Sequence, residues 1–245
     1  MCFYSVILPT YNERENLPYV VALLDWAFEQ AGARERYEVV VVDDGSPDGT
    51  AAVARRLQSF LGAERVVLAE RPGKLGLGTA YRHGLERVSG ACTHVVLMDA
   101  DLSHHPLALP RMIACAEATA ADIVTGTRYG GGDGAGVCGW NWRRKAVSSV
   151  ANALAQTLLA PGASDLTGSF RLYRRPALQQ LLAVTHSRGY VFQMEVMVRA
   201  TRQFGFRVAE VPIVFVDRMF YGESKLGRQD IVEYLLGLWR LFWTV

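Results

Sequence analysis

The sequence predicts an α/β fold in which helices cover both faces of a mostly parallel, doubly wound sheet. Short runs of β-branched and aliphatic residues alternate five times with segments whose apolar residues recur at helical spacing. The run from Val39 to Val42 is apolar at every position, as expected of a strand buried on both faces of a parallel sheet. No internal repeat, linker or low-complexity tract interrupts the pattern, so we expect residues 1–245 to form one domain.

The expected elements follow one another regularly. The first five predicted strands are apolar runs, at 6–8, 39–42, 66–68, 95–98 and 123–124. Helical periodicity separates them, at 17–28, 53–61, 81–88 and around 112–113. The segment 130–139 holds six glycines, which predicts a mobile loop. Beyond it we expect a helix over 147–158, a strand over 170–173, two further helices and a C-terminal helix from Arg228.

Composition narrows the possible classes of protein. The 26 basic and 24 acidic residues leave a net charge of +2, which argues against a nucleic-acid partner. The four cysteines form no CxxC pair, so we expect free thiols in a reducing compartment. The first predicted strand begins too close to Met1 to leave room for a signal peptide. The longest largely apolar stretch, 231–245, is shorter than the ~18 residues of a membrane span, so no transmembrane segment is expected.

The carboxyl ends of the predicted strands are where a doubly wound sheet binds its ligands. Asp99 and Asp101 form the chain's only D-x-D pair and directly follow an apolar strand. In an extended segment both carboxylates point the same way, so they can hold Mg²⁺ or Mn²⁺ together with a diphosphate. The alternative is a solvated turn with two capping aspartates. The chain contains neither a Walker A loop nor a complete dinucleotide-binding glycine motif, so a P-loop enzyme or dehydrogenase is not expected.

Other polar groups surround this pair in the predicted fold. Asp44 follows four valines and can accept hydrogen bonds from a base or ribose. Three cations, Arg143, Arg144 and Lys145, fall on the first turn of a predicted helix, where they oppose the helix dipole unless an anion lies nearby. A solvated basic face is the alternative. Adjacent His104 and His105 would point to opposite sides of an extended chain, so we do not expect them to bind one metal ion together.

Six stretches, in order across nearly the whole chain, resemble those of the dolichol-phosphate mannosyltransferases. They are Pro9–Glu13, Asp43–Thr50, Lys74–Tyr81, Asp99–Pro106, Asp165–Arg171 and Gly222–Leu226. The likeness is to the soluble catalytic subunit of animals and many other eukaryotes, a family 2 glycosyltransferase with a GT-A fold. It implies a nucleotide-sugar half, about 1–127, and an acceptor half with the C-terminal helix, 128–245. Ser103 stands where prokaryotic relatives offer a glutamine to the metal.

The resemblance also assigns roles to individual residues. By this likeness the GDP moiety is held by Pro9, Tyr11, Glu13, Val42 and Asp44. Asp99, Ala100 and Asp101 hold its phosphates and the metal, Mg²⁺ or Mn²⁺. Arg128, Arg218 and Lys225 complete the donor and acceptor phosphate sites, and the residues expected to carry catalysis are Asp101, Arg128 and Arg144. We expect substitution of Arg128 or Arg144 to lower activity more than it disturbs folding.

The implied reaction is an inverting transfer of mannose from GDP-mannose to dolichyl phosphate at the cytosolic face of the endoplasmic reticulum. The acceptor phosphate is already ionised at pH 7, so no general base is needed. One alternative is a polyprenyl-phosphate glucosyltransferase that uses UDP-glucose. The other is a non-catalytic protein that binds nucleotide sugars and needs no cationic acceptor site.

The C-terminal helix has an unusually wide apolar surface. Its polar positions form one narrow stripe, made of Asp230, Glu233, Gly237, Arg240 and Thr244. A helix packed on one core needs an apolar face of only ~100°. We therefore expect one side to pack inward and the end that carries Trp239, Phe242 and Trp243 to meet a bilayer or small membrane-embedded subunits, as the resemblance implies. The alternative is a helix held in a groove of its own domain.

Overall fold

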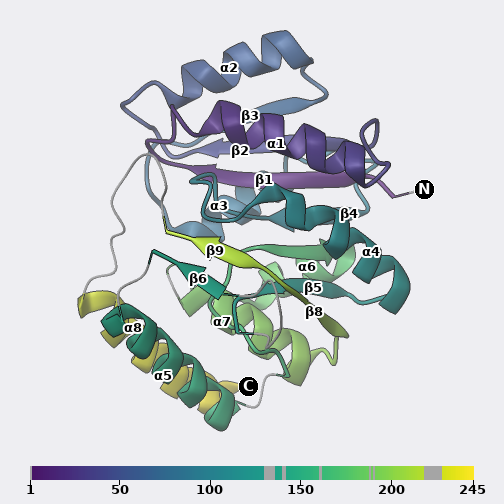
Figure 1. Cartoon of the computed structure of the whole chain (residues 1–245). Helices are drawn as coiled ribbons and strands as arrows, with labels where there is room; N and C mark the ends of the chain where they lie inside the picture. Colours follow the sequence, from purple (N-terminus) through teal and green to yellow (C-terminus); the bar gives the residue numbers. More distant parts are fainter. Residues whose placement is uncertain are drawn as a thin grey trace.

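The computed structural model describes residues 2–129, 136–139, 142–159, 162–187, 189, 191–217 and 228–245. At 143–147, 151, 158 and 228–235 it describes the backbone alone. Helices lie on both faces of a central sheet (Figure 1). The strands of this sheet are β1 (Tyr4–Thr10), β2 (Tyr37–Asp43), β3 (Val66–Glu70), β4 (His94–Leu97), β5 (Ile123–Thr127), β7 (Arg171–Arg174) and β8 (Val208–Pro212). The helices are α1 (Leu17–Gln30), α2 (Thr50–Leu61), α3 (Leu77–Leu85), α4 (Leu109–Thr119), α5 (Trp142–Leu159), α6 (Arg175–Val184), α7 (Val191–Val198) and α8 (Arg228–Thr244), with short helical turns η1 (Pro106–Ala108) and η2 (Arg199–Gln203).

The seven strands are ordered β3-β2-β1-β4-β7-β5-β8, which confirms the predicted mostly parallel sheet. β7 is its one antiparallel member and lies between β4 and β5. Because β7 runs the other way, the residues that precede it reach the edge where β4 and β5 end. Sequence periodicity predicted this strand but not its direction, and the direction decides which side chains meet at the site.

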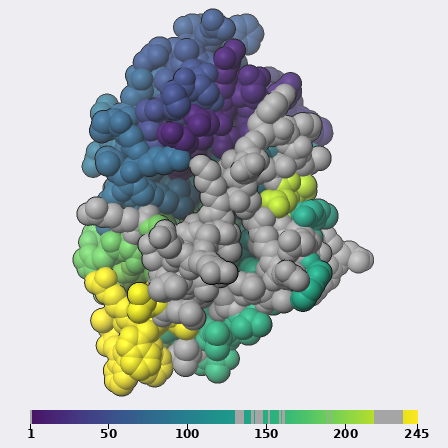
Figure 2. Space-filling model, turned by 90° about the vertical axis from the view of Figure 1, so that its left-hand side faces the viewer, coloured from purple at the N-terminus to yellow at the C-terminus, as the bar shows by residue number. Residues whose placement is uncertain are grey.

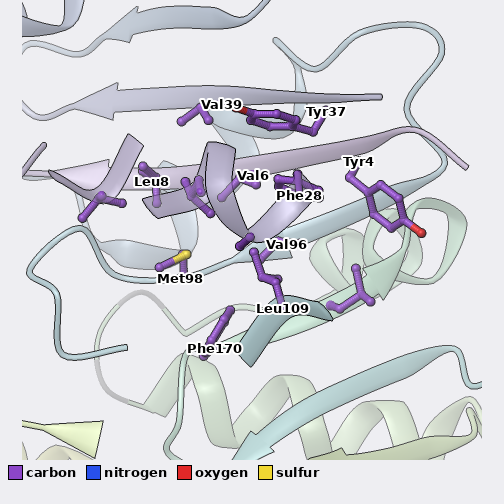
Figure 3. Packing of buried hydrophobic residues seen from close by; sticks show 14 of the residues in the cluster. Tyr4, Val6, Leu8, Phe28, Tyr37, Val39, Val96, Met98, Leu109 and Phe170 are labelled. Atoms are coloured by element: carbon purple, nitrogen blue, oxygen red, sulfur yellow. The ribbon is translucent and has the colours of Figure 1, made fainter. Parts of the chain in front are cut away.

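The apolar core consists of two layers, one on each face of the sheet. Alternate residues of β1 serve different layers: Val6 and Leu8 pack under α1, while Ile7 packs with α3. Figure 3 shows the first layer, where the rings of Phe28 and Tyr37 stack at a centroid distance of 4.2 Å. Such alternation explains why the valine run of β2 is apolar at every position.

Three strands were absent from the predicted elements. β6 (Gly136–Cys138) pairs in parallel with β9 (Val214–Val216) in a second, two-stranded sheet. β6 therefore corrects the prediction that 130–139 is a mobile loop throughout. It was missed because glycine frequency outweighed its one β-branched residue, Val137. β8 extends the main sheet beyond β5.

The C-terminal helix packs partly as predicted. Leu238 and Leu241 are buried against the second core layer. Gly237, which belongs to the predicted polar stripe, instead lies so close to α7 that an added Cβ would stand 2.4 Å from Val191. The side chains of Trp239 and Trp243 remain 64% and 68% exposed. No helix within the described ranges is long and apolar enough to cross a membrane.

Candidate functional site

Hydrogen bonds join the carboxyl ends of β1 and β2 and also join the segments that follow these strands. Thr10 Oγ1 donates to Asp43 Oδ1 at 3.1 Å, and the amide of Glu13 donates to Thr50 Oγ1 at 3.0 Å. Asp43 also accepts from the Ser46 amide and hydroxyl, at 3.0 and 2.6 Å. These strands end at the left of Figure 1, and Figure 2 looks onto that edge, with the N-terminal half in purple and blue above. Asp43 is thus a structural residue that fixes the loop carrying Asp44.

Asp44 forms a bidentate ion pair with Arg71, which follows β3. Arg71 Nε and Nη2 donate to its two carboxylate oxygens, each at 2.7 Å. Arg71 Nη1 donates to Thr79 Oγ1 of α3 at 2.8 Å. The side chain of Asp44 is 13% exposed and that of Arg71 is 4% exposed. Asp44 is the nucleotide ligand predicted from the sequence, and Arg71 orients its carboxylate.

The other residues expected to bind the nucleoside lie in different surroundings. Tyr11 carries the ammonium of Lys74 over its ring, 3.4 Å from the centroid. Glu13 is buried and accepts from Asn16 Nδ2 at 2.7 Å. Pro9 is half-buried, whereas Val42 is fully buried in the core and leaves no exposed surface for a ligand.

Asp99 and Asp101 follow β4 and lie at the same edge. Ser169, from the loop before β7, donates to Asp99 Oδ2 at 2.8 Å. Asp101 Oδ1 accepts from the Ser103 amide at 3.0 Å. Leu102, between Asp101 and Ser103, has a φ of 62°. This conformation costs a non-glycine residue roughly 1–2 kcal/mol and recurs at functional sites. Ala100 is buried, so the carboxylates are the exposed part of the motif.

His104 closes the back of this motif. Its Nδ1 lies 3.6 Å from Asp99 Oδ2, and its ring packs against Phe170 and Phe215 at 5.5 and 5.2 Å. Burial lowers the pKa of His104, against the opposing effect of Asp99 and Asp101, so the ring is neutral at pH 7. His105 is exposed and caps the η1 turn by accepting from the Leu107 amide at 3.3 Å. The two histidines point apart, as predicted.

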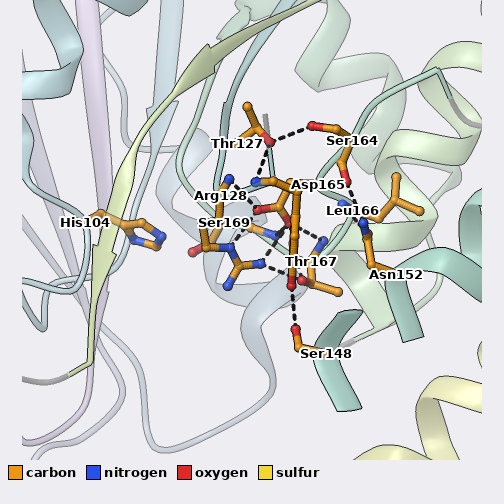
Figure 4. Close-up of polar contacts among 12 residues, drawn as sticks. His104, Thr127, Arg128, Ser148, Asn152, Ser164, Asp165, Leu166, Thr167 and Ser169 are labelled. Carbon is orange, nitrogen blue, oxygen red and sulfur yellow. Dashed lines mark hydrogen bonds and ion pairs between the residues drawn. The ribbon is translucent and has the colours of Figure 1, made fainter. Parts of the chain in front are cut away.

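Arg128, at the end of β5, is held by Asp165 from the loop before β7 (Figure 4). Arg128 Nε and Nη2 donate to the two carboxylate oxygens at 2.6 and 2.8 Å, and Nη2 also donates to Thr167 Oγ1 at 2.6 Å. Asp165 is fully buried and also accepts from the amides of Thr167 and Gly168 at 3.2 and 3.0 Å. Burial raises the pKa of Asp165, but the hydrogen bonds and charge of Arg128 outweigh it and hold that pKa below its usual value.

Because Arg128 neutralises a fully buried carboxylate, its loss leaves that charge unpaired, so we expect substitution of Arg128 to disturb folding. That activity falls by more than stability stays a prediction. The cationic segment 143–145 does fall on the first turn of α5, as predicted, and that turn carries no acidic residue. The side chain of Arg144, together with Arg218 and Lys225, lies outside the described residues.

The donor set fits a hard divalent cation. Asp99 and Asp101 offer carboxylate oxygens, and nearby Ser103 Oγ is buried without a hydrogen-bond partner in the described part of the chain. Within that part, no group of three His, Cys, Asp or Glu side chains is arranged to bind a metal ion. Mg²⁺ is commonly held by one or two carboxylates together with substrate phosphates, so two acidic ligands suffice. Mg²⁺ or Mn²⁺ would be held here by Asp99 and Asp101.

Four further residues at or beneath the site received no individual role from the sequence: Arg71, Asp165, Ser169 and Arg171. Asp165, Ser169 and Arg171 belong to a quoted motif, but only the antiparallel direction of β7 shows that Asp165 binds Arg128 and that Ser169 binds Asp99. Arg71 carries no local signal, since a lone arginine after a strand is ordinary. Its partner becomes evident only once β2 and β3 are paired.

Residues 5–182 match the family described as Glycosyl transferase family 2. The chain is a family 2 glycosyltransferase. It is 41% identical, over 93% of its length and 82% of the relative's, to the polyprenol monophosphomannose synthase of Mycolicibacterium smegmatis. It is 36% identical, over 96% of its length and 91% of the relative's, to the undecaprenyl-phosphate mannosyltransferase of Micrococcus luteus.

Solved structures share the fold of this glycosyltransferase. Mannosyl-3-phosphoglycerate synthase from Rubrobacter xylanophilus matches with a TM-score of 0.69 at 18% identity, over 98% of this chain and 72% of that one. Mannosyltransferase PcManGT from Pyrobaculum calidifontis, in complex with GDP-Man and Mn²⁺, matches with a TM-score of 0.61 at 20% identity, over 97% and 63%. At these identities the likeness establishes the GT-A fold.

Proposed function

We propose that this glycosyltransferase transfers mannose from GDP-mannose to a polyprenyl phosphate, with inversion at the anomeric carbon. The observation that carries the proposal is the similarity of nearly the whole chain to enzymes named for mannosyl transfer to polyprenol and undecaprenyl phosphate. The site supports it with a carboxylate pair at the end of β4 beside an ordered arginine. We propose guanine as the base of the nucleotide sugar and a long polyprenyl chain on the acceptor. Dolichyl phosphate is the acceptor expected from the sequence.

The residues of this chain would divide the work as follows. Asp44, oriented by Arg71, would accept hydrogen bonds from the nucleoside, with Pro9, Tyr11 and Glu13 beside it. A divalent cation on Asp99 and Asp101 would neutralise the diphosphate leaving group. Arg128, with Arg144, Arg218 and Lys225, would hold the acceptor phosphate in line with the anomeric carbon. The acceptor is already ionised at pH 7, so no side chain needs to remove a proton.

We also propose that α8 brings the enzyme to the membrane that holds its lipid acceptor. Trp239, Phe242 and Trp243 are exposed on one side while Leu238 and Leu241 pack inward. Tryptophan is favoured at membrane interfaces, where an apolar ring and a polar N–H are both accommodated. The sequence resemblance further predicts that this surface of α8 contacts small membrane subunits. It also predicts that the membrane is the endoplasmic reticulum, at its cytosolic face.

Acceptor and donor substitution tests the proposed reaction. Purified protein with Mg²⁺ and GDP-mannose should form a mannosyl lipid with polyprenyl phosphate and none with the corresponding polyprenol. UDP-glucose should give little product. Glucosyl lipid from UDP-glucose would establish the rival glucosyltransferase instead. Nucleotide-sugar binding without any product would indicate a non-catalytic binding protein.

A further inference from the structure

Among the residues that the structure describes, most buried side-chain polar atoms without a well-formed hydrogen bond lie around one arginine. Arg171 of β7 is fully buried on the face of the sheet that α3 and α7 cover. By distance and angle, Tyr81 Oη, Thr125 Oγ1, Arg171 Nε and both amide atoms of the Gln193 side chain lack a well-formed hydrogen bond in the described part of the chain, although the side chains of Tyr81 and Gln193 interact with each other. Thr125 is the register partner of Arg171 across the β5–β7 ladder. Packing alone does not explain such a concentration of polar groups in a protein core.

The charge of Arg171 is not neutralised by a bonded carboxylate in the described part of the chain. Its Nη1 donates to the Gln193 carbonyl at 2.9 Å and its Nη2 to the Leu166 carbonyl at 3.1 Å. The hydroxyl of Tyr173, at 3.5 Å, is a third neutral partner. The other two buried arginines differ, because Arg71 and Arg128 each bind an aspartate bidentately.

This charge lies directly beneath the candidate site. Arg171 is opposite Leu97 in the β4–β7 ladder, two residues before Asp99. It also contributes to lowering the pKa of Asp165, after the larger effects of burial, which opposes the shift, and of Arg128. A buried unpaired cation is costly to fold, and natural proteins accept such local costs chiefly at functional sites.

We propose that Arg171 is an electrostatic positioning residue: its buried charge gives the carboxyl edge a positive potential that attracts the diphosphate of the donor. Arg171 also fixes the Leu166 carbonyl, and with it the loop that presents Asp165 and Ser169. It does not touch the ligand. This inference rests on the proposed function, because the anion it names is the nucleotide diphosphate of that reaction.

A potential acts with opposite sign on anions and cations. Removing the charge should weaken the binding of GDP without metal and tighten the binding of Mn²⁺ alone. A unit charge about 10 Å away, at an effective dielectric constant of about 20, changes an affinity on the order of tenfold. A loss of structure at the site would weaken both ligands together, so the pair of measurements separates the two causes.

The experiment compares Arg171→Lys, which keeps the charge, with Arg171→Met and Arg171→Gln, which remove it. Arg82→Met is the matched control, because Arg82 also donates to backbone carbonyls, those of Leu182 and Thr185, but is exposed. Calorimetry measures GDP in excess chelator and, separately, Mn²⁺ alone. We expect the neutral variants to bind GDP about tenfold more weakly and Mn²⁺ more tightly than wild type. Arg171→Lys and Arg82→Met should stay within about twofold of wild type.

Three results would overturn the inference: equal loss in Arg171→Lys and the neutral variants, Mn²⁺ binding that is weakened or unchanged in the neutral variants, or neutral variants that fail to fold while Arg171→Lys folds. Wild-type protein that binds neither GDP nor UDP would instead refute the proposed function. The Mn²⁺ measurement still tests Arg171 in that event, because tighter binding in the neutral variants supports the positive potential, whereas unchanged or weaker binding refutes it.

Discussion

Asp165 and Arg128 form a buried bidentate pair, with Nε and Nη2 of the guanidinium 2.6 and 2.8 Å from the two carboxylate oxygens. The pair connects the end of β5 to the loop that precedes β7. An arginine expected to bind phosphate is therefore oriented, and its charge balanced, by a residue from a distant part of the chain. If Arg128 binds phosphate as proposed, its function and its contribution to folding depend on the same ion pair.

Arg128→Ala should destabilise the protein by about 3–5 kcal/mol, because it leaves the Asp165 carboxylate buried and unpaired. Arg34→Ala is the matched control: Arg34 binds Asp25 in the same bidentate manner, but at the surface. Its loss should cost no more than ~1 kcal/mol. Urea denaturation measures both free energies of unfolding. Similar small losses of unfolding free energy in the two variants would show that the Arg128–Asp165 pair stabilises the protein no more than an exposed ion pair does.

The same pair predicts an acid-sensitive stability. The ordinary pKa of an aspartate is 3.8, and that of Asp165 is lower in the folded state. Its ionised form therefore stabilises the fold fully above the unfolded pKa, and this contribution is lost as the pH falls from about 4 through the folded pKa. Asp165→Asn should show a shallower loss of unfolding free energy below pH 4 than wild type. Parallel curves would contradict this assignment.

Asp44 and Arg71 should act as one unit in donor binding. Asp44→Ala and Arg71→Ala should each weaken GDP binding at least tenfold, and the double variant should be little worse than either single variant, because each loss already misplaces the nucleoside ligand. Titration of GDP against the four proteins completes the cycle. Additive losses would mean that the two residues contribute independently.

Asp101→Ala should abolish transfer, since the diphosphate leaving group loses half of its carboxylate clamp for the cation. The loss of turnover should exceed a hundredfold, with a melting temperature close to that of wild type. Excess chelator should have the same effect on wild-type protein. Normal turnover under either condition would remove the metal from the proposed reaction.

The aromatic side of α8 and its leucine side should respond differently to substitution. Trp239→Ser with Trp243→Ser should release the protein from vesicles of phosphatidylcholine and anionic lipid without changing its melting temperature. Leu238→Ser with Leu241→Ser should instead lower that temperature, because both leucines are buried. For the same reason, deletion of 238–245 would unfold part of the core and cannot test anchoring alone.

Tyr19→Ser with Phe60→Ser provides the control for general surface hydrophobicity, since both side chains are exposed elsewhere on the molecule. These substitutions should leave vesicle binding intact. Wild-type protein that ignores lipid vesicles but sediments with native membranes would point to a membrane subunit as the partner of α8. Equal release by both aromatic pairs would contradict a specific role for this helix.

Local sequence patterns predicted the elements that depend on neighbouring residues. The valine run of β2 and the apolar spacing from Leu17 to Phe28 each specify their structure locally, and both elements were confirmed. The D-x-D pair was likewise found at a strand end. The short strand β6 was not predicted, because its pairing with β9 depends on residues far along the chain.

Contacts between distant segments also explain why the supporting residues of the site could not be predicted from the sequence. Asp165 and Ser169 reach Arg128 and Asp99 only because β7 enters the sheet antiparallel, which no period-two pattern encodes. Resemblance supplied candidate ligands without their supports, so Asp44 was predicted and Arg71 was not. Val42 was assigned to the nucleotide by resemblance alone. Its side chain is fully buried in the structure, which the resemblance does not take into account.

One competition assay distinguishes mannosyl transfer to a lipid phosphate from every alternative reaction. Purified protein receives Mg²⁺, a polyprenyl phosphate and an equimolar mixture of GDP-mannose and UDP-glucose, and the lipid product is analysed by mass spectrometry and for anomeric configuration. We predict a single β-mannosyl polyprenyl phosphate formed with one GDP released per lipid. A glucosyl lipid, an α-linked product, or hydrolysis of the donor without lipid product would contradict the account.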